Sequence, residues 1–139
     1  MSEIDLYHPL ILERNKNPKF FSSDQEGTII SAYNPVCGDE FQIAIEVADH
    51  KIKKVTFKGY GCAVSKAAID ILIEQLLNLD QEEAIRQIEK YFDIIDSEQP
   101  PPIDIYPLAV FQKVKHHPSR RDCATLGSDA ILKFLKNWS

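Results

Sequence analysis

Hydrophobic and polar residues alternate along two neighbouring segments in the first half of the chain. Apolar residues occupy every second position of 41–47, which is the period expected of a strand with one buried face. A second segment of this kind covers 52–57, and the turn residues between the two predict a β-hairpin. A further strand is predicted at 28–33. Because no helical pattern separates these segments, we expect an antiparallel sheet.

The pattern becomes helical after Gly61. Apolar residues fill most of the helix circumference across 63–77, so this helix is predicted to be largely buried against the sheet. One narrow polar stripe runs along it, formed by Lys66, Asp70, Glu74 and Asn78. Further helices are predicted near the N-terminus at 6–14, with Pro9 suited to a first turn, and at 80–91, 108–114 and 123–137.

These elements predict an α+β fold in which a small antiparallel β-sheet of about three strands packs against several helices. The chain has 139 residues, of which 44% are hydrophobic and 27% charged, as is typical of a globular domain. We expect one domain spanning 1–139, since this length suits one core rather than two. A proline-rich segment at 97–107 is predicted to be a loop.

The charge balance narrows the classes of partner. Sixteen basic and 21 acidic residues give a formal net charge of −5, which disfavours nucleic acid because phosphate binding needs clustered lysine and arginine. No apolar run approaches the roughly 20 residues that span a bilayer. The first residues are acidic and lack the order of a secretory signal. We therefore expect a cytoplasmic protein without a membrane partner.

The three cysteines carry the candidate chemistry. Their odd number excludes a complete disulfide framework, which leaves them as buried small side chains, metal ligands or a nucleophile. Cys37 lies in a turn rich in proline and glycine, Cys62 is predicted to open the buried helix, and Cys123 to open the last helix. Helix N-termini favour the thiolate form of a cysteine.

A shared metal ion is one reading of these positions. Cys37 and Asp39 are two residues apart in the turn, and with Cys62 and Cys123 they supply four donors of the kinds that zinc accepts. The spacing alone leaves buried, inert thiols as an open alternative. The excess negative charge of such a site could be offset by the neighbouring Lys58, Lys66, Arg120 and Arg121. His116 and His117 are not expected to be ligands, because Pro118 breaks the local geometry.

Three separated motifs carry a resemblance that favours the metal reading. They are Asn-Pro-Val-Cys-Gly-Asp at 34–39, Gly-Tyr-Gly-Cys-Ala-Val-Ser at 59–65 and Arg-Arg-Asp-Cys-Ala-Thr-Leu at 120–126. In this order they resemble the iron–sulfur assembly family of SufU, IscU and the NifU N-terminal domain. The long segment before Cys123, the arginine at position 120 and the Ala-Thr-Leu that follows are closer to the SufU branch. Asp122 departs from that branch, which more often has lysine there.

The resemblance implies zinc held by Cys37, Asp39, Cys62 and Cys123. It also implies a sulfurtransferase-type relay beside a PLP-dependent, SufS-like cysteine desulfurase. In this relay Cys37 would accept the persulfide sulfur. Arg120 could hydrogen-bond the thiolate or the persulfide, and the alternative is that it is a solvated surface charge. Downstream acceptors would be an iron–sulfur scaffold or apo-proteins. The alternatives are an IscU-like scaffold for a transient [2Fe–2S] cluster or iron, and a non-catalytic adaptor in which zinc only stabilises the fold.

Overall fold

The computed structural model describes residues 9–96, 108, 110–112 and 118–138. The loop predicted at 97–107 lies outside the described residues, as do His116 and His117.

Three antiparallel strands form a sheet in the order β1-β2-β3. They are β1 (Thr28–Asn34), β2 (Asp39–Ala48) and β3 (Lys51–Tyr60). Each predicted strand is confirmed and is longer than its apolar pattern suggested. Asp49 and His50 join β2 to β3 with φ values of 54° and 62°, as a two-residue hairpin turn requires.

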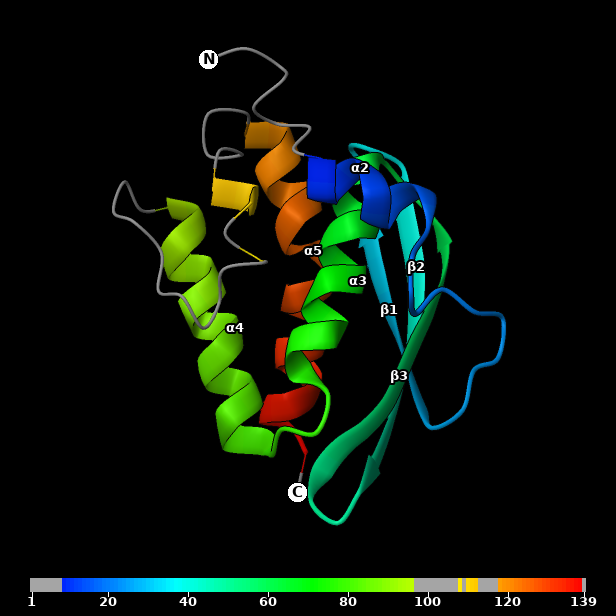
Figure 1. Ribbon diagram of the computed structural model, residues 1–139, viewed down its shortest axis with the longest axis vertical. Coiled ribbons are helices and arrows are strands. Elements are labelled where there is room, and N and C mark those ends of the chain that lie inside the picture. The colour runs from blue at the N-terminus through cyan, green and yellow to red at the C-terminus, as the bar shows by residue number, and fades with distance from the viewer. Residues whose placement is uncertain (1–8, 97–107, 109, 113–117, 139) are drawn as a thin grey trace.

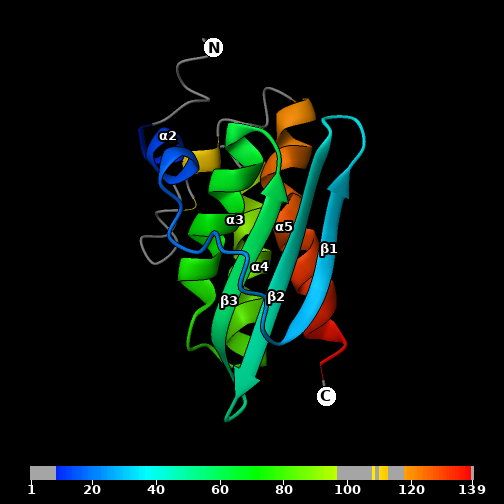
Figure 2. The same ribbon diagram turned by 90° about the vertical axis from the view of Figure 1, so that its right-hand side faces the viewer.

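The helices form layers on one face of this sheet (Figures 1 and 2). They are α2 (Pro9–Lys16), α3 (Ala63–Leu76), α4 (Gln81–Asp96) and α5 (Pro118–Lys136). The pair α3 and α5 lies between the sheet and α4, and α2 packs across one end of α3 (Figure 1). The predicted α+β class and the antiparallel sheet are confirmed.

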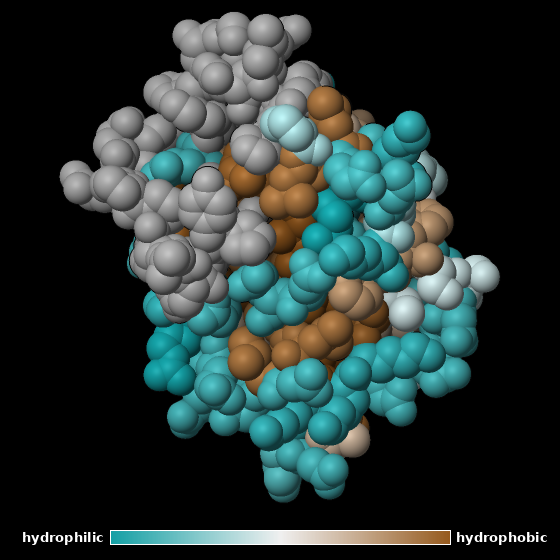
Figure 3. Space-filling model, viewed as in Figure 1, coloured by the Kyte–Doolittle hydropathy of each residue, from teal (hydrophilic) through white to brown (hydrophobic). Residues whose placement is uncertain are grey.

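Helix α3 supplies much of the core, as its sequence predicts. Ten of its 14 residues are buried, and they pack with the inner side chains of the sheet, including Phe41 and Phe57. On the face shown in Figure 3, apolar surface gathers in the middle, between α2 and α4, and hydrophilic surface borders it. The polar stripe of α3 is not wholly exposed, because Asp70 is fully buried.

Helix α4 begins where its sequence predicts and ends later. The Asp80 carboxylate accepts from the Glu83 N–H at 2.8 Å and the Glu83 carboxylate accepts from the Asp80 N–H at 3.2 Å, a reciprocal cap. The helix continues to Asp96 because Ile94 and Ile95 still face the core. In the described part of the chain, no helix combines the length and the apolar character needed to cross a bilayer.

Candidate metal centre

The turn between β1 and β2 positions Cys37 and Asp39. The Asn34 side chain accepts from the Val36 N–H at 3.1 Å, and Gly38 has a φ of 72°, which glycine adopts without strain. Asp39 then pairs with Asn34 as the first residue of β2. Cys37 is half-buried in this turn, whereas Asp39 is fully buried.

Cys62 caps the N-terminus of α3, as predicted. Its Sγ accepts from the Ser65 N–H at 3.5 Å, and the Ser65 hydroxyl donates to the Cys62 carbonyl at 3.0 Å. Gly61 makes this approach possible, because an added Cβ would lie 2.6 Å from Ser65 Oγ and 2.7 Å from the Phe41 ring. Ser65 stands in the first turn, as its position after Cys62 predicts, but its hydroxyl reaches back to the cap carbonyl rather than to a free N–H of the helix.

The prediction that Cys123 opens the last helix is wrong. Helix α5 begins at Pro118, a residue whose fixed φ suits a first helical position. Cys123 therefore lies inside the helix, where its side chain is fully buried. Tyr91 of α4 supports this turn, because its buried hydroxyl donates to the Ala124 carbonyl at 2.7 Å.

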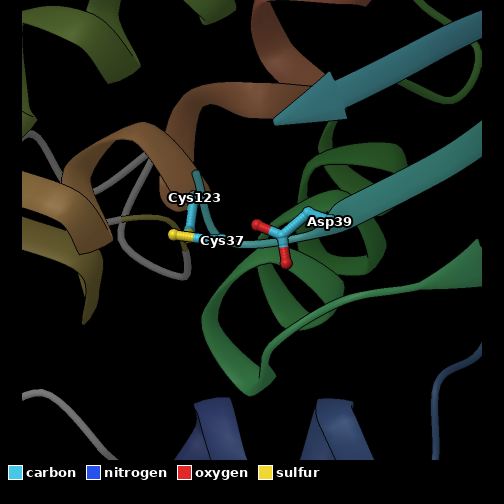
Figure 4. A group of neighbouring side chains, drawn as sticks. All are labelled: Cys37, Asp39 and Cys123. Atoms are coloured by element: carbon cyan, nitrogen blue, oxygen red, sulfur yellow. The ribbon is translucent and has the colours of Figure 1, made fainter. Parts of the chain in front are cut away.

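The fold brings three of the four predicted ligands together. One ligand atom from each of Cys37, Asp39 and Cys123 lies within 4.8 Å of the other two. Figure 4 shows them converging from the β1–β2 turn and from α5. Cys62 adjoins this group, because its N–H donates to Asp39 Oδ1 at 2.9 Å, while its sulfur is held by Ser65 at the start of α3.

One atom of this group lacks the partner that its burial demands. Asp39 Oδ2 is buried and has no hydrogen-bond partner among the described residues. A buried carboxylate oxygen without a partner costs free energy unless a cation or donor meets it. Two sulfurs and this oxygen are also a donor set that zinc accepts, with the adjoining Cys62 as a further sulfur. The residues therefore fit a zinc ion.

Electrostatics support the same reading. Burial raises the pKa of the Cys123 thiol, and the neighbouring Asp39, Cys37 and Cys62 side chains raise it further. A thiol in such surroundings gives up its proton when a cation replaces that proton. The buried space between these side chains is therefore better suited to a cation than to thiolates without a counterion.

Two of the predicted basic neighbours contact residues outside the candidate metal centre. Arg121 forms two 2.8 Å hydrogen bonds with Asp96, and Lys66 lies 4.7 Å from the centre of the Phe21 ring. Arg120 is half-buried in the first turn of α5, three residues before Cys123. Residues three apart share a helix face, so Arg120 is the basic residue that α5 places on the side of its cysteine.

The chain is similar to several known proteins. Residues 6–104 match the family described as the NifU-like N-terminal domain. The chain is 26% identical over 129 residues to the zinc-dependent sulfurtransferase SufU of Bacillus subtilis, covering 92% of this chain and 88% of that one. It is also 26% identical to the iron–sulfur cluster assembly scaffold protein IscU of Thermotoga maritima, covering 96% and 95% of the two chains.

Solved structures share the fold. A protein of Fervidobacterium islandicum, described as an iron–sulfur cluster assembly scaffold for the SUF system, superposes with a TM-score of 0.82 at 26% identity, over 96% of this chain and 98% of that one. The NifU-like N-terminal protein of Brucella abortus gives a TM-score of 0.84 at 17% identity, with 97% and 96% covered. The family match covers most of the chain, and the chain therefore belongs to the NifU-like N-terminal domain family.

Proposed function

We propose that this chain is an iron–sulfur cluster assembly protein of the SufU type, which accepts sulfur on Cys37 from a cysteine desulfurase. One observation carries the proposal. Within the cluster of Cys37, Asp39 and Cys123, Cys37 is only partly buried, whereas Asp39 and Cys123 are fully buried. An incoming persulfide can therefore reach Cys37. The related B. subtilis protein is named as a zinc-dependent sulfurtransferase.

The transfer is a thiol exchange. The Cys37 thiolate attacks the terminal sulfur of the desulfurase persulfide, a new sulfur–sulfur bond forms at Cys37, and the desulfurase cysteine leaves as a thiolate. Atoms and electrons balance without an external oxidant or reductant. The sulfur that reaches Cys37 is then available to a downstream scaffold or apo-protein by the same exchange.

The turn around Cys37 suits this role. Gly38 has open space where a Cβ would stand, whereas Cys62 stands at the start of a helix and Cys123 inside one. Movement of a short glycine-containing turn requires less rearrangement than movement of a helix start or interior. Cys37 is thus the sulfur that can turn toward a partner while the remaining donors stay in place.

Zinc would be held by Cys37, Asp39 and Cys123, with Cys62 as the fourth ligand. When bound, it keeps cysteine sulfurs deprotonated at neutral pH. Arg120 supplies the positive charge on the same side of α5 as Cys123, where its guanidinium can hydrogen-bond a thiolate or the incoming persulfide. The partner is a PLP-dependent, SufS-like cysteine desulfurase.

A scaffold function is the second candidate, because the T. maritima relative is named as an iron–sulfur cluster scaffold and matches almost the whole chain. The same four residues would then hold a [2Fe–2S] cluster. Anaerobic reconstitution separates the two functions: a scaffold becomes brown and passes its cluster to an apo-ferredoxin, whereas the sulfur acceptor keeps about one zinc per chain and does neither.

The deciding experiment is mass spectrometry after incubation with desulfurase and cysteine. A sulfur relay predicts an added sulfur atom on Cys37 in the wild-type chain and none in Cys37→Ala. Glu40→Ala is the matched control, since Glu40 is exposed and also follows the turn. If Cys37→Ala keeps its fold and metal and stimulates the desulfurase as the wild type does, the relay is wrong and the adaptor reading replaces it.

A further inference from the structure

One edge of the sheet is open. Strand β1 pairs with β2 along one side and is an edge strand of the sheet. Figure 2 shows it at the rim of the sheet with α5 behind it. In the described part of the chain no segment pairs with its other side. The opposite edge is covered, because Phe57 of β3 exchanges backbone hydrogen bonds of 3.0 and 2.9 Å with Phe20 and Ser22.

The open edge lacks the usual protection. Strand β1 has the sequence Thr-Ile-Ile-Ser-Ala-Tyr-Asn, without charge or proline, and its register with β2 is unbroken from Thr28 to Asn34. Natural proteins protect exposed edges with lysine, proline or a bulge. Ile29 and Tyr33 are moreover 52% and 61% exposed. An unprotected, apolar edge is the kind that pairs with another strand.

A groove of about 380 Å³ lies between this edge and α5. Its lining is mainly apolar, from Ile30 of β1 and from Ala130, Phe134 and Trp138. The Phe134 and Trp138 rings stack with their centres 6.4 Å apart. Side chains of a strand point alternately to its two faces, so an added strand would direct every second side chain toward this groove.

The charge of the groove lining indicates which kind of segment binds in it. Lys133 is the charged residue that lines the groove, and it is exposed. In an antiparallel pairing of β1 with β1 of a second copy, the paired strand itself would supply no acidic residue to Lys133, because β1 contains none. An extended segment with one carboxylate satisfies the lysine as well as the strand edge, which favours a different protein as the partner.

We propose that the β1 edge and the adjoining groove bind an extended segment of a partner protein. The segment adds as a fourth strand, with apolar side chains at alternate positions in the groove and an acidic residue beside Lys133. Lys133 lies ten residues after Cys123, which is about 15 Å along the axis of α5. The groove around Lys133 is therefore removed from the metal centre, although the Asn34 end of the β1 edge adjoins the turn that carries Cys37, and the proposal does not depend on the sulfur-transfer function.

The test uses fluorescein-labelled eight-residue peptides in which valine alternates with threonine or serine and one glutamate takes each valine position in turn. A matched panel carries lysine in place of glutamate. Fluorescence anisotropy with the full chain should show at least one glutamate peptide binding about tenfold more tightly than its lysine counterpart. Its addition should shift backbone amide resonances of β1 and of the second half of α5.

Three variants separate the proposed contacts. Lys133→Glu should reverse the preference, so that the lysine peptide binds more tightly. Lys136→Glu makes the same change in an exposed residue of the same helix that does not line the groove, and should leave the preference intact. Ala130→Leu fills the groove and should weaken binding of both peptides.

Three results would overturn the proposal. The first is equal affinity for the glutamate and lysine peptides, or no binding of either. The second is a set of shifted resonances away from β1 and α5. The third is concentration-dependent dimerisation in analytical ultracentrifugation that Ile30→Lys abolishes, since it would make a second copy the occupant of this edge.

Discussion

Arg14 of α2 and Asp70 of α3 form a buried ion pair with 2.5 Å between Nε and Oδ2. The guanidinium also donates to the Asp70 carbonyl at 3.1 Å. The same carboxylate accepts from the backbone N–H groups of Lys19 and Phe20 at 3.0 and 2.8 Å. One side chain of the central helix thus fixes both α2 and the segment that covers the β3 edge.

Asp70→Asn should destabilise the protein by about 3 kcal/mol, since removing the buried partner leaves only the half-exposed Glu74 to offset the Arg14 charge. Urea unfolding followed by circular dichroism measures this. The matched control is Glu74→Gln, which removes a half-exposed partner of the same arginine and should cost less than about 1 kcal/mol. Equal losses in the free energy of unfolding for the two variants would show that Asp70 contributes no more to stability than Glu74 does.

Glu74 should also contribute to the pH dependence of stability. Its hydrogen bond to Lys19 lowers the pKa of its carboxyl group, burial opposes this shift, and Arg14 adds to it. A carboxyl group with a lowered folded-state pKa stabilises the protein above its unfolded value of about 4.3. This contribution is lost as the pH falls through the folded pKa.

The measurement is the free energy of unfolding in urea between pH 3 and pH 6. The difference between wild type and Glu74→Gln should shrink toward low pH, by a few tenths of a kcal/mol because the side chain is partly exposed. A difference that stays constant, or grows, across this range would contradict the assignment.

Asp39→Ala should weaken zinc binding at least about 100-fold, because even the loss of a residue behind the ligands often costs 10–100-fold in metal affinity. Competition with a chromogenic chelator gives the affinity. Glu40→Ala, one residue later and exposed, should bind zinc as the wild type does. If Asp39→Ala retains full affinity while folded, Asp39 is not a ligand and its unpaired oxygen has another partner.

Gly61→Ala should be more damaging than Gly38→Ala. The added methyl group at Gly61 would overlap the Phe41 ring and Ser65, at a cost of about 1–3 kcal/mol. At Gly38 it would meet open space and only strain a positive φ, which costs roughly 1 kcal/mol. Thermal unfolding of the two variants, compared with wild type, tests this order.

The sheet and the buried helix could be predicted because their signals are local. Alternation along β2 and β3 requires only neighbouring residues, and so does the apolar circumference of α3. The burial of Asp70 could not be read from its helix, where it belongs to a polar stripe. Its partner Arg14 is 56 positions away, and only the packing of α2 brings the two together.

Sequence motifs indicate four residues for the candidate site, but they do not give the geometry of the site. Motif resemblance selected Cys37, Asp39, Cys62 and Cys123, and the fold gathers three of their ligand atoms within 4.8 Å. The predicted position of Cys123 at the helix start is wrong because α5 begins at Pro118, five residues earlier. The hydrogen bond from the Ser65 N–H to the Cys62 sulfur depends on the direction of the Cys62 side chain at the helix start. Residue spacing alone does not give this direction.

The candidate metal centre joins a turn in the first third of the chain to the second turn of its last helix. An unfolded chain keeps these donors far apart, so a bound ion would favour the native state alone. Such an ion would act as a folding ligand, raising the thermal midpoint in proportion to the logarithm of its free concentration. Cells short of zinc would then contain less of the folded protein, and its abundance would follow metal supply.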